Sequence, residues 1–519
     1  MERKSRQRRP RRQTQTGWSP AQARSKAVRP GFTGGRYKPL TDRELERIHH
    51  TVLNVMENYG FADANPSMVE TITAAGGWMS EDGRLHFPRA LVEDIIARAP
   101  KSFVMPGQDP KHDMEIGGNR VHMGTGGAAP EIIDFKTGRY RESTSTDLYD
   151  IARLVDTLDN IHFFWRTNIT RDAQTMRDVD LNTVYASMSG TSKHIGVSFV
   201  IGEHVYEAVE MMDYVLGGEG AFRQRPFCSI SCCHVVPPLR FAQESCDALE
   251  AAVRTGMPIT LLSAAQAGAT SPAALAGTIV QAISETLAGL IFVYLIDPNC
   301  RANLGTWPFV SDLRTGAMCA GAPELALLVA GCSQMAGFYH LPNSCAAGMT
   351  DSKTPDAQAG MERGYTLTLA AQAGADLIME SAGMHASLMA TCMESFVIDN
   401  DNLGAVNRTV RGIEVSDETL SYEVIGEVIH GEGHFLGSAQ TIERMETDYY
   451  YPPMGDRHTP AVWEEMGSTT IRDRARQRVV ETLQQHYPSH IDAAKDEELR
   501  RRFNIVLPRE NMLPTKRRW

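Results

Sequence analysis

Polar and aromatic side chains recur where the predicted β-strands of this chain end, and together they suit the binding of an organic cation. The face of a Trp ring attracts a quaternary ammonium group, and a nearby carboxylate compensates its charge. Such side chains would line a pocket wherever the strand ends meet. The candidates at the strand ends are Arg166, Asn168, His234, Gln266, Trp307, Phe309, Met349, Asp351, Glu380 and His385.

Two further motifs have residue types that occur in cofactor or metal sites. The run 124–127 (Gly-Thr-Gly-Gly) follows a predicted strand, but it lacks the third glycine and the distal acid of a dinucleotide site, which favours a tight turn. Cys232, Cys233 and His234 could supply zinc ligands, but adjacent residues on a strand point to opposite faces. We therefore expect buried thiols there, no metal site and no tightly bound cofactor.

The elements that would position these side chains alternate between short β-rich runs and apolar-faced helices over residues 119–395. Eight such runs with helical crossovers predict an α/β fold, a (β/α)8 TIM barrel, whose active site lies at the carboxyl ends of the strands. The runs cover residues 121–126, 162–168, 194–200, 227–235, 259–266, 301–307, 339–346 and 376–381.

Helical regions are predicted on both sides of the barrel. Residues 39–118 form a helical N-terminal extension that opens with a capping box at Thr41 and Glu44. Residues 396–519 form a helical C-terminal region. Residues 1–38 carry a net charge of +11 and are rich in Arg, Pro, Gln and Gly, which predicts a disordered basic tail.

Composition excludes several classes of protein. The 519 residues are 42% hydrophobic and carry a net charge of −11, which is typical of a globular protein. The longest apolar run, 287–296, is too short to span a membrane. The chain beyond residue 38 has a net charge of −22, which disfavours nucleic acid on its surface. Nine cysteines, an odd number, fit reduced thiols in the cytoplasm.

Several runs spread over residues 41 to about 470 resemble the trimethylamine methyltransferase family, whose archaeal members transfer a methyl group from trimethylamine to a corrinoid protein. The most specific of them is 346–360, Ala-Ala-Gly-Met-Thr-Asp-Ser-Lys-Thr-Pro-Asp-Ala-Gln-Ala-Gly. Others are 124–126, 271–273, 397–401, 415–420 and 456–458. The resemblance implies a (β/α)8 barrel and a methyltransferase that works with a separate corrinoid carrier, because no cobalamin-binding DxHxxG motif is present.

The sequence departs from the archaeal enzymes at one important position. They carry pyrrolysine directly after the Ala-Gly of the motif, and this chain has Met349 there. It is similar instead to the branch without pyrrolysine, whose members demethylate quaternary amines such as glycine betaine, proline betaine or carnitine. A quaternary ammonium leaves as a neutral amine and needs no proton donor, so a methionine is compatible with that chemistry. The resemblance therefore implies a quaternary amine or betaine as substrate.

The resemblance also implies roles for the candidate residues. Met349 would line the wall where the methyl group is presented to cobalt, and Glu380 or His385 would offset or orient the ammonium group. Trp307 and Phe309 would form a cation cage. A carboxylate tail would be held by a set of polar side chains, among which Arg166 offers the strongest, bidentate pair. The set is Arg166, Asn168, His234 and Gln266.

Other functions stay open at this point. The enzyme could be specific for trimethylamine itself. A barrel lyase or aldolase would need a Schiff-base lysine, but Lys193 begins a strand and Lys353 lies in a loop. A non-catalytic onium-binding protein, or one that binds nucleic acid through its basic tail, is a third class. We also expect a homo-oligomer, which is common for proteins of this size.

Overall fold

The computed structural model describes residues 26–514 and 518–519, and these residues form two compact units. The larger unit comprises Val28–Ile413 and Tyr451–Trp519, and the smaller unit includes Glu414–Tyr450. Residues 1–25 of the predicted basic tail lie outside the described residues. The later part of that tail contains strand β1 (Phe32–Thr33), which pairs antiparallel with β6.

The larger unit is built on a sheet in which eight consecutive strands run parallel, and β1 is added antiparallel at one edge. The order of the eight is β6-β19-β18-β16-β14-β11-β10-β9. Each of the eight predicted β-rich runs overlaps one of them. Their bounds are β6 (Arg120–Met123), β9 (Phe164–Trp165), β10 (Ile195–Val197), β11 (Cys228–Cys232), β14 (Ile259–Ser263), β16 (Ala302–Thr306), β18 (Asn343–Ala346) and β19 (Leu377–Met379).

The two ends of this parallel series, β6 and β9, approach each other. Gly124 and Phe163 form a parallel bridge, and the His162 N–H donates to the Met123 carbonyl at 2.7 Å. The sheet is therefore strongly curled, with its concave side forming the core of the unit.

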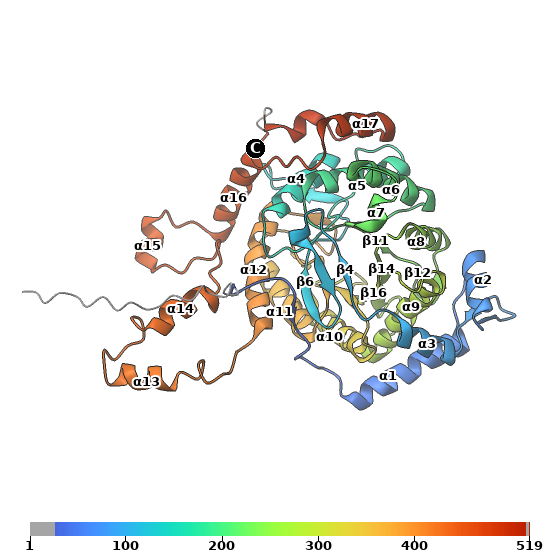
Figure 1. Cartoon of the computed structure of the whole chain (residues 1–519), viewed down its shortest axis with the longest axis horizontal. Coiled ribbons are helices and arrows are strands. Elements are labelled where there is room, and N and C mark those ends of the chain that lie inside the picture. The colour runs from blue at the N-terminus through green and yellow to red at the C-terminus, as the bar shows by residue number, and fades with distance from the viewer. Residues whose placement is uncertain (1–25, 515–517) are drawn as a thin grey trace, which may run out of the picture. The chain divides into compact units, whose positions relative to one another are not determined.

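A helix follows each parallel strand and packs on the outer side of the curled sheet (Figure 1). Long apolar faces explain this placement, because each helix must bury one face against the strands. The helices are α4 (Ser145–Asp156), α5 (Met176–Gly190), α6 (Gly202–Leu216), α8 (Gln243–Thr255), α9 (Leu275–Ile296), α10 (Pro323–Phe338), α11 (Ala357–Ala373) and α12 (Met393–Arg411).

Helix α9 is long and apolar enough to cross a membrane by length and composition. In the structure 89% of its most apolar 18-residue window is buried, and the helix packs against β14, β16 and the N-terminal helix α1 (Asp42–Asn54). Its apolar character is thus explained by burial on nearly all sides.

The N-terminal segment of the larger unit begins with α1, and the capping box predicted at Thr41 and Glu44 is present. The helix continues as a π-helical turn, Val55–Tyr59, and ends at Gly60. It is followed by short elements. These are α2 (Pro66–Ala74), β2 (Trp78–Met79), β3 (Leu85–His86), α3 (Arg89–Arg98), β4 (Phe103–Met105) and β5 (Met114–Ile116).

The C-terminal part of the larger unit contains α15 (Pro460–Glu465), α16 (Ile471–Gln485) and α17 (Ala493–Phe503), and α16 packs on α12. The smaller unit contains α13 (Tyr422–Ile429) and α14 (Ala439–Thr447). The region that the sequence predicts as one helical block, 396–519, is therefore divided between the two units.

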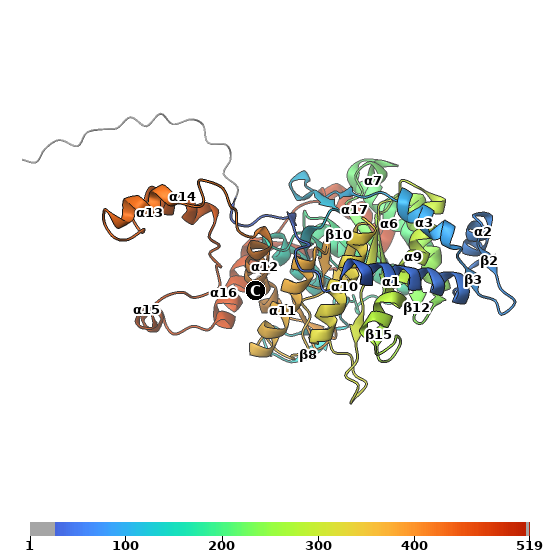
Figure 2. The same cartoon turned by 90° about the horizontal axis from the view of Figure 1, so that it is seen from below.

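Short strands follow the carboxyl ends of the parallel strands and surround that end of the sheet. Several of them, including β8, β12 and β15, lie along one side of the larger unit in Figure 2. Strands β7 and β8 pair antiparallel as a hairpin. The short strands are β7 (Glu131–Ile133), β8 (Tyr140–Glu142), β12 (Val235–Val236), β13 (Arg240–Phe241), β15 (Gln266–Ala267), β17 (Phe309–Val310), β20 (Met384–His385) and β21 (Ala390–Thr391).

Candidate active site at the carboxyl ends of the strands

Arg166, Cys233 and Glu380 follow β9, β11 and β19 at the carboxyl ends of the strands. The side chain of Cys233 is solvent-exposed, and desolvation by surrounding protein raises the pKa of its thiol. From these two observations we infer a recess around Cys233. The guanidinium of Arg166 lowers the pKa of this thiol and the carboxylate of Glu380 raises it, so both charges lie within electrostatic reach of Cys233.

Arg166 follows β9 and contributes a positive charge to this recess. Its side chain is half-buried, and desolvation lowers the pKa of its guanidinium while Asp180 and Cys233 raise it. Among the described residues, no side chain or carbonyl forms a hydrogen bond or ion pair with this guanidinium. Asp180 is itself engaged by His204 at 2.7 Å and by the Val200 N–H at 3.2 Å. Arg166 is therefore available to bind an anionic group.

Glu380 follows β19 and contributes a buried carboxyl group. The residue is 2% exposed, and its Oε2 has no hydrogen-bond partner within the described structure. Burial raises the pKa of this carboxyl to about 8, so the group is mostly protonated at neutral pH. Its backbone has a φ of 59°, a conformation that is costly for a residue other than glycine and that tends to occur at functional sites.

Gly126 explains how Glu380 fits at the end of the first parallel strand. A Cβ at this position would lie 3.0 Å from the Glu380 Cγ and 3.2 Å from its backbone nitrogen. The run 124–127, which the sequence analysis interpreted as a tight turn, therefore also provides room for the Glu380 side chain.

Gly348 likewise provides room for a close approach, here between the turn after β18 and the backbone next to Glu380. Its φ is 96°, and a Cβ there would lie 2.8 Å from the Ser381 Cα and 3.0 Å from the Ser381 carbonyl oxygen. Both contacts are with backbone that cannot move independently of Glu380. Gly348 thus allows the turn that carries Met349 to pack directly against Ser381, the residue that follows Glu380.

Replacing Gly348 by alanine is expected to lower the free energy of unfolding by about 3 kcal/mol, from the left-handed backbone conformation and the backbone clash together. Denaturant-induced unfolding followed by circular dichroism measures this change. Gly360→Ala is the matched control, because Gly360 lies in α11 with no atom within 4 Å of the added Cβ. An equal loss of stability in both variants would contradict the assignment.

The loop that carries Met349 is held rigidly by buried ionic groups. Arg363 donates to the Gly348 carbonyl at 3.0 Å and forms an ion pair with Asp399 at 3.3 Å. Glu362 accepts from the Asp351 N–H at 2.8 Å. Met349 itself is fully buried and belongs to the apolar core. These contacts hold the turn after β18 in one arrangement, and the Met349 side chain fills space in the apolar core beside it.

Trp307 follows β16 and is 7% exposed. Its indole N–H donates to the Ser344 hydroxyl of β18 at 3.4 Å, so the ring lies on the concave side of the sheet. Deeper on the same side, the Trp165 indole packs over Gly196 and donates to the Ser231 hydroxyl. Two buried aromatic rings thus pack within the curled sheet.

The remaining predicted residues form hydrogen bonds with the protein itself. His234 points the other way from Cys233, and its Nε2 lies 2.9 Å from the Glu285 carbonyl of α9. Gln266 accepts from Ser311 at 3.0 Å beside the β15–β17 ladder that contains Phe309. His385 is buried between the Ser395 hydroxyl at 2.7 Å and the Ser352 carbonyl. Their contact with a ligand stays a prediction.

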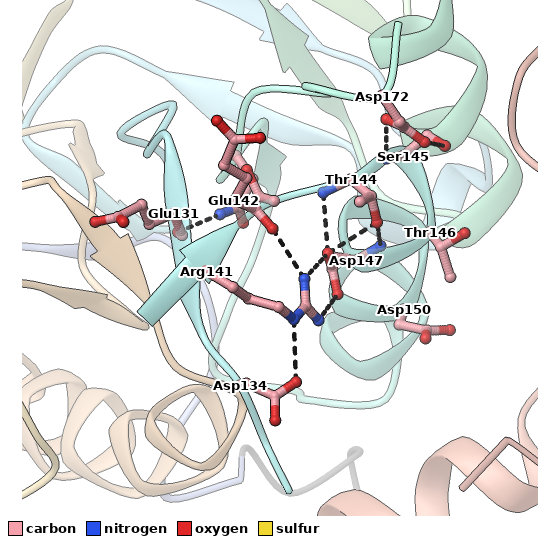
Figure 3. Close-up of polar contacts among 12 residues, drawn as sticks. Glu131, Asp134, Arg141, Glu142, Thr144, Ser145, Thr146, Asp147, Asp150 and Asp172 are labelled. Carbon is pink, nitrogen blue, oxygen red and sulfur yellow. Dashed lines mark hydrogen bonds and ion pairs between the residues drawn. The ribbon is translucent and has the colours of Figure 1, made fainter. Parts of the chain in front are cut away.

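Asn168, which follows β9, belongs to a network of polar contacts between short elements of the larger unit. It donates to the Glu131 carbonyl at 2.9 Å and accepts from Thr391 at 3.0 Å, so it ties β9 to the hairpin β7–β8 and to β21. Arg141 on β8 forms a bidentate pair with Asp147 of α4 and a bond with Asp134 at 3.0 Å (Figure 3). This network holds the hairpin against α4.

Cys233 is the residue that sequence reasoning missed. It was considered only as a zinc ligand or a buried thiol, and the expectation of burial is wrong for Cys233 although correct for Cys232. The alternation of β11 contained the necessary signal, because Ser231 and Cys233 share one face and Cys232 and His234 share the other. Within the described residues, no group of three or more His, Cys, Asp or Glu side chains could hold a metal ion.

Comparison with known proteins gives a consistent result over nearly the whole chain. The family described as trimethylamine methyltransferase (MTTB) matches residues 3–510. Trimethylamine methyltransferase MttB of Methanosarcina thermophila is 34% identical over 88% of this chain and 94% of its own length. The Methanosarcina barkeri protein of the same name is 33% identical over 88% and 92%. A glycine betaine methyltransferase of Desulfitobacterium hafniense is 28% identical over 89% and 96%.

Proposed function

This chain belongs to the trimethylamine methyltransferase family, and on that premise we propose that it transfers a methyl group from a betaine, a small quaternary amine with a carboxylate, to a corrinoid protein. The observation that supports a betaine is the pairing of an unengaged guanidinium, Arg166, with a buried carboxyl group, Glu380, around one recess. The two groups match the two charges of such a ligand. The similarity to a glycine betaine methyltransferase supports the same substrate class.

The fold supports this function if the curled sheet acts as a closed (β/α)8 barrel. We infer closure from the Gly124–Phe163 bridge between β6 and β9, the two ends of the series. In a barrel the carboxyl ends of all eight strands converge on one site, which would bring Trp307 and Met349 to the same recess as Arg166 and Glu380. The scaffold residues Asn168, His234, Gln266, Phe309 and His385 would then shape the site from behind.

The proposed roles follow from charge and burial. Arg166 binds the carboxylate through charge-assisted hydrogen bonds. Glu380 loses its proton and compensates the ammonium charge, and the Trp307 ring contacts the methyl groups. Met349 and the rigid loop around it exclude water and hold one methyl group toward the opening of the recess. No residue needs to donate a proton, because a quaternary ammonium leaves as a neutral amine.

A reduced corrinoid on a separate carrier protein would supply the nucleophile that accepts the methyl group. The recess fits such a reaction, because Cys233 is solvent-exposed and the site can therefore be reached from outside. The short strands that surround the carboxyl ends would form the contact area for the carrier. We place the reaction in the cytoplasm, since all nine cysteines are free thiols.

Trimethylamine is the alternative substrate, because the most similar of the relatives above carry that name. It has no carboxylate, so it would leave Arg166 without a partner. In water near neutral pH trimethylamine is mainly protonated on its nitrogen, and this proton must be removed before a methyl group can be transferred. The residue at the corresponding position of this chain, the buried Met349, cannot accept a proton. Both features favour the betaine.

Binding of glycine betaine at pH 7 is expected to release close to one proton, because a fixed cation favours the ionised form of Glu380. The carboxyl of the free enzyme has a pKa of about 8, so affinity rises by up to about tenfold per pH unit below 8 and levels off above it. Calorimetry in buffers of different ionisation enthalpy measures the released proton. The ligand itself does not titrate in this range, so an apparent enthalpy that is the same in every buffer at pH 7 would contradict the proposal.

A further inference from the structure

Two segments of opposite charge join the protein at the same end of helix α12. The segment Glu414–Tyr450, here called the acidic arm, begins shortly after α12 ends at Arg411. It contains nine carboxylates and one arginine, a net charge of −8. Residues 1–25 of the basic tail contain eight Arg or Lys and one Glu, a net charge of +7. The charges of the two segments therefore nearly cancel.

Contacts of the residues that follow the tail fix where it joins the protein. The Asn407 amide of α12 donates to the Arg29 carbonyl at 2.6 Å. The Arg36 guanidinium donates to the carbonyl of Arg411, the last residue of α12, at 3.5 Å. Lys26 and Ala27 belong to the same compact unit as the acidic arm. The tail and the arm therefore both start beside the C-terminal end of α12.

The acidic arm has too little positive charge of its own to compensate its carboxylates. Its single arginine, Arg444, already serves three of them. The guanidinium donates to Glu418 and lies 3.9 Å from Glu414 and 3.7 Å from Asp448. Carboxylates crowded into so short a segment repel one another, so a cationic partner for the arm is favoured. Within the described part of the chain, no basic side chain pairs with Glu423, Glu427 or Glu446.

The basic tail is the part of the chain that can supply this partner. Residues 26–413 and 451–519 together have a net charge of −10, so the larger unit adds to the repulsion and does not relieve it. The tail is tethered next to the arm, which gives it an effective concentration in the millimolar range. An extended chain of 25 residues reaches about 80 Å, so the tether does not limit the contact.

We propose that residues 1–25 of the basic tail bind the acidic arm of the same chain and compensate its charge. Seven of the eight basic residues of the tail are arginines, which pair with carboxylates and also stack on aromatic rings. The contact is electrostatic, so it weakens as salt is added. This inference is independent of the proposed function. The arm provides aromatic partners as well, namely Tyr422, Phe435, Tyr449 and Tyr450.

Trypsin cleavage after the arginines of the tail tests the inference in the full-length chain. At low salt the wild-type tail is expected to be cleaved about tenfold more slowly than the tail of a variant with a neutralised arm, because a bound tail is protected. At about 0.5 M salt the two rates become equal. The arm variant carries Glu423→Gln, Glu427→Gln, Glu432→Gln and Glu446→Gln. The matched control replaces four exposed glutamates of the larger unit and keeps the protection, with Glu46→Gln, Glu81→Gln, Glu219→Gln and Glu497→Gln.

Two outcomes of this experiment would overturn the inference. One is equal cleavage of the wild-type protein and the arm variant at low salt. The other is an equal loss of protection in the arm variant and the control, because the effect would then come from net charge alone. Circular dichroism shows whether each variant stays folded.

A second measurement on the wild-type protein needs no variant. Lys4 is the single lysine of residues 1–25, and a carbodiimide joins a lysine to a carboxylate that it contacts. Mass spectrometry is expected to find Lys4 joined to carboxylates of the acidic arm. In a mixture of isotope-labelled and unlabelled protein, both joined peptides come from one chain. Cross-links confined to the larger unit or formed between two chains would overturn the inference, and so would protection from trypsin that appears only when duplex DNA is added.

Discussion

Glu380→Gln is expected to bind glycine betaine about 25-fold more weakly than the wild-type protein at pH 7. An ion pair at about 5 Å and an effective dielectric constant of about 20 contributes about 3.3 kcal/mol. Ionising a carboxyl with a pKa of about 8 at pH 7 requires about 1.4 kcal/mol of that. At pH 9 this cost disappears, and the difference between the two proteins rises to about 250-fold.

Calorimetric titrations of both proteins from pH 6 to 9 measure this effect. The variant is expected to lose the pH dependence of binding together with the proton release. Asp376→Asn provides the matched control, because Asp376 is buried just before β19, at the opposite end of that strand from Glu380, and burial raises its pKa to about 7. If the control changed the pH profile as much as Glu380→Gln, the effect would be structural, and the proposed ion pair would be wrong.

Arg166→Met is expected to weaken glycine betaine binding by about 10- to 100-fold, because hydrogen bonds between charged groups contribute about 1.5 to 3 kcal/mol in a desolvated site. Methionine keeps the length and the apolar part of the side chain, so the recess keeps its shape. Arg166→Lys keeps the charge but not the bidentate geometry, so its affinity for glycine betaine is expected to lie between those of the wild-type protein and Arg166→Met. Titration with glycine betaine and with tetramethylammonium separates the contribution of the ligand's carboxylate to the affinity from that of its ammonium group.

Tetramethylammonium has no carboxylate, so Arg166→Met should bind it as well as the wild-type protein does, or better. Arg177→Met is the control for the general loss of an arginine, since Arg177 forms its ion pair with Glu207 on the outer helices. A loss of affinity that is equal for the two ligands would show that Arg166 supports the fold of the recess and does not bind a carboxylate.

The positions of the strands could be predicted from the sequence, because burial on both faces produces short apolar runs between helices of clear periodicity. The same reasoning located Glu380 and Arg166 directly after their strands. The direction of individual side chains was less accessible. His234 and Cys233 are neighbours, and only the partners of β11 decide that His234 faces α9 and Cys233 faces the recess.

Energetic properties of the site could not be predicted from the sequence. The raised pKa of Glu380 results from burial by residues of several distant elements, including Gly126 of the first strand. The unengaged state of Arg166 likewise depends on Asp180 being held by His204 and Val200. The segment Glu414–Tyr450 was predicted as part of one C-terminal helical block, because its helices have ordinary amphipathic patterns. The sequence does not show which elements cover those patterns, so the division into two units could not be predicted.

Methyl transfer from a panel of substrates to free, reduced cobalamin tests the central claim most directly. The account predicts turnover with glycine betaine or a related betaine, little or none with trimethylamine, and a rate for the betaine that falls when Arg166 is replaced by methionine. Faster demethylation of trimethylamine than of every betaine tested, with Arg166→Met unimpaired, would contradict the account.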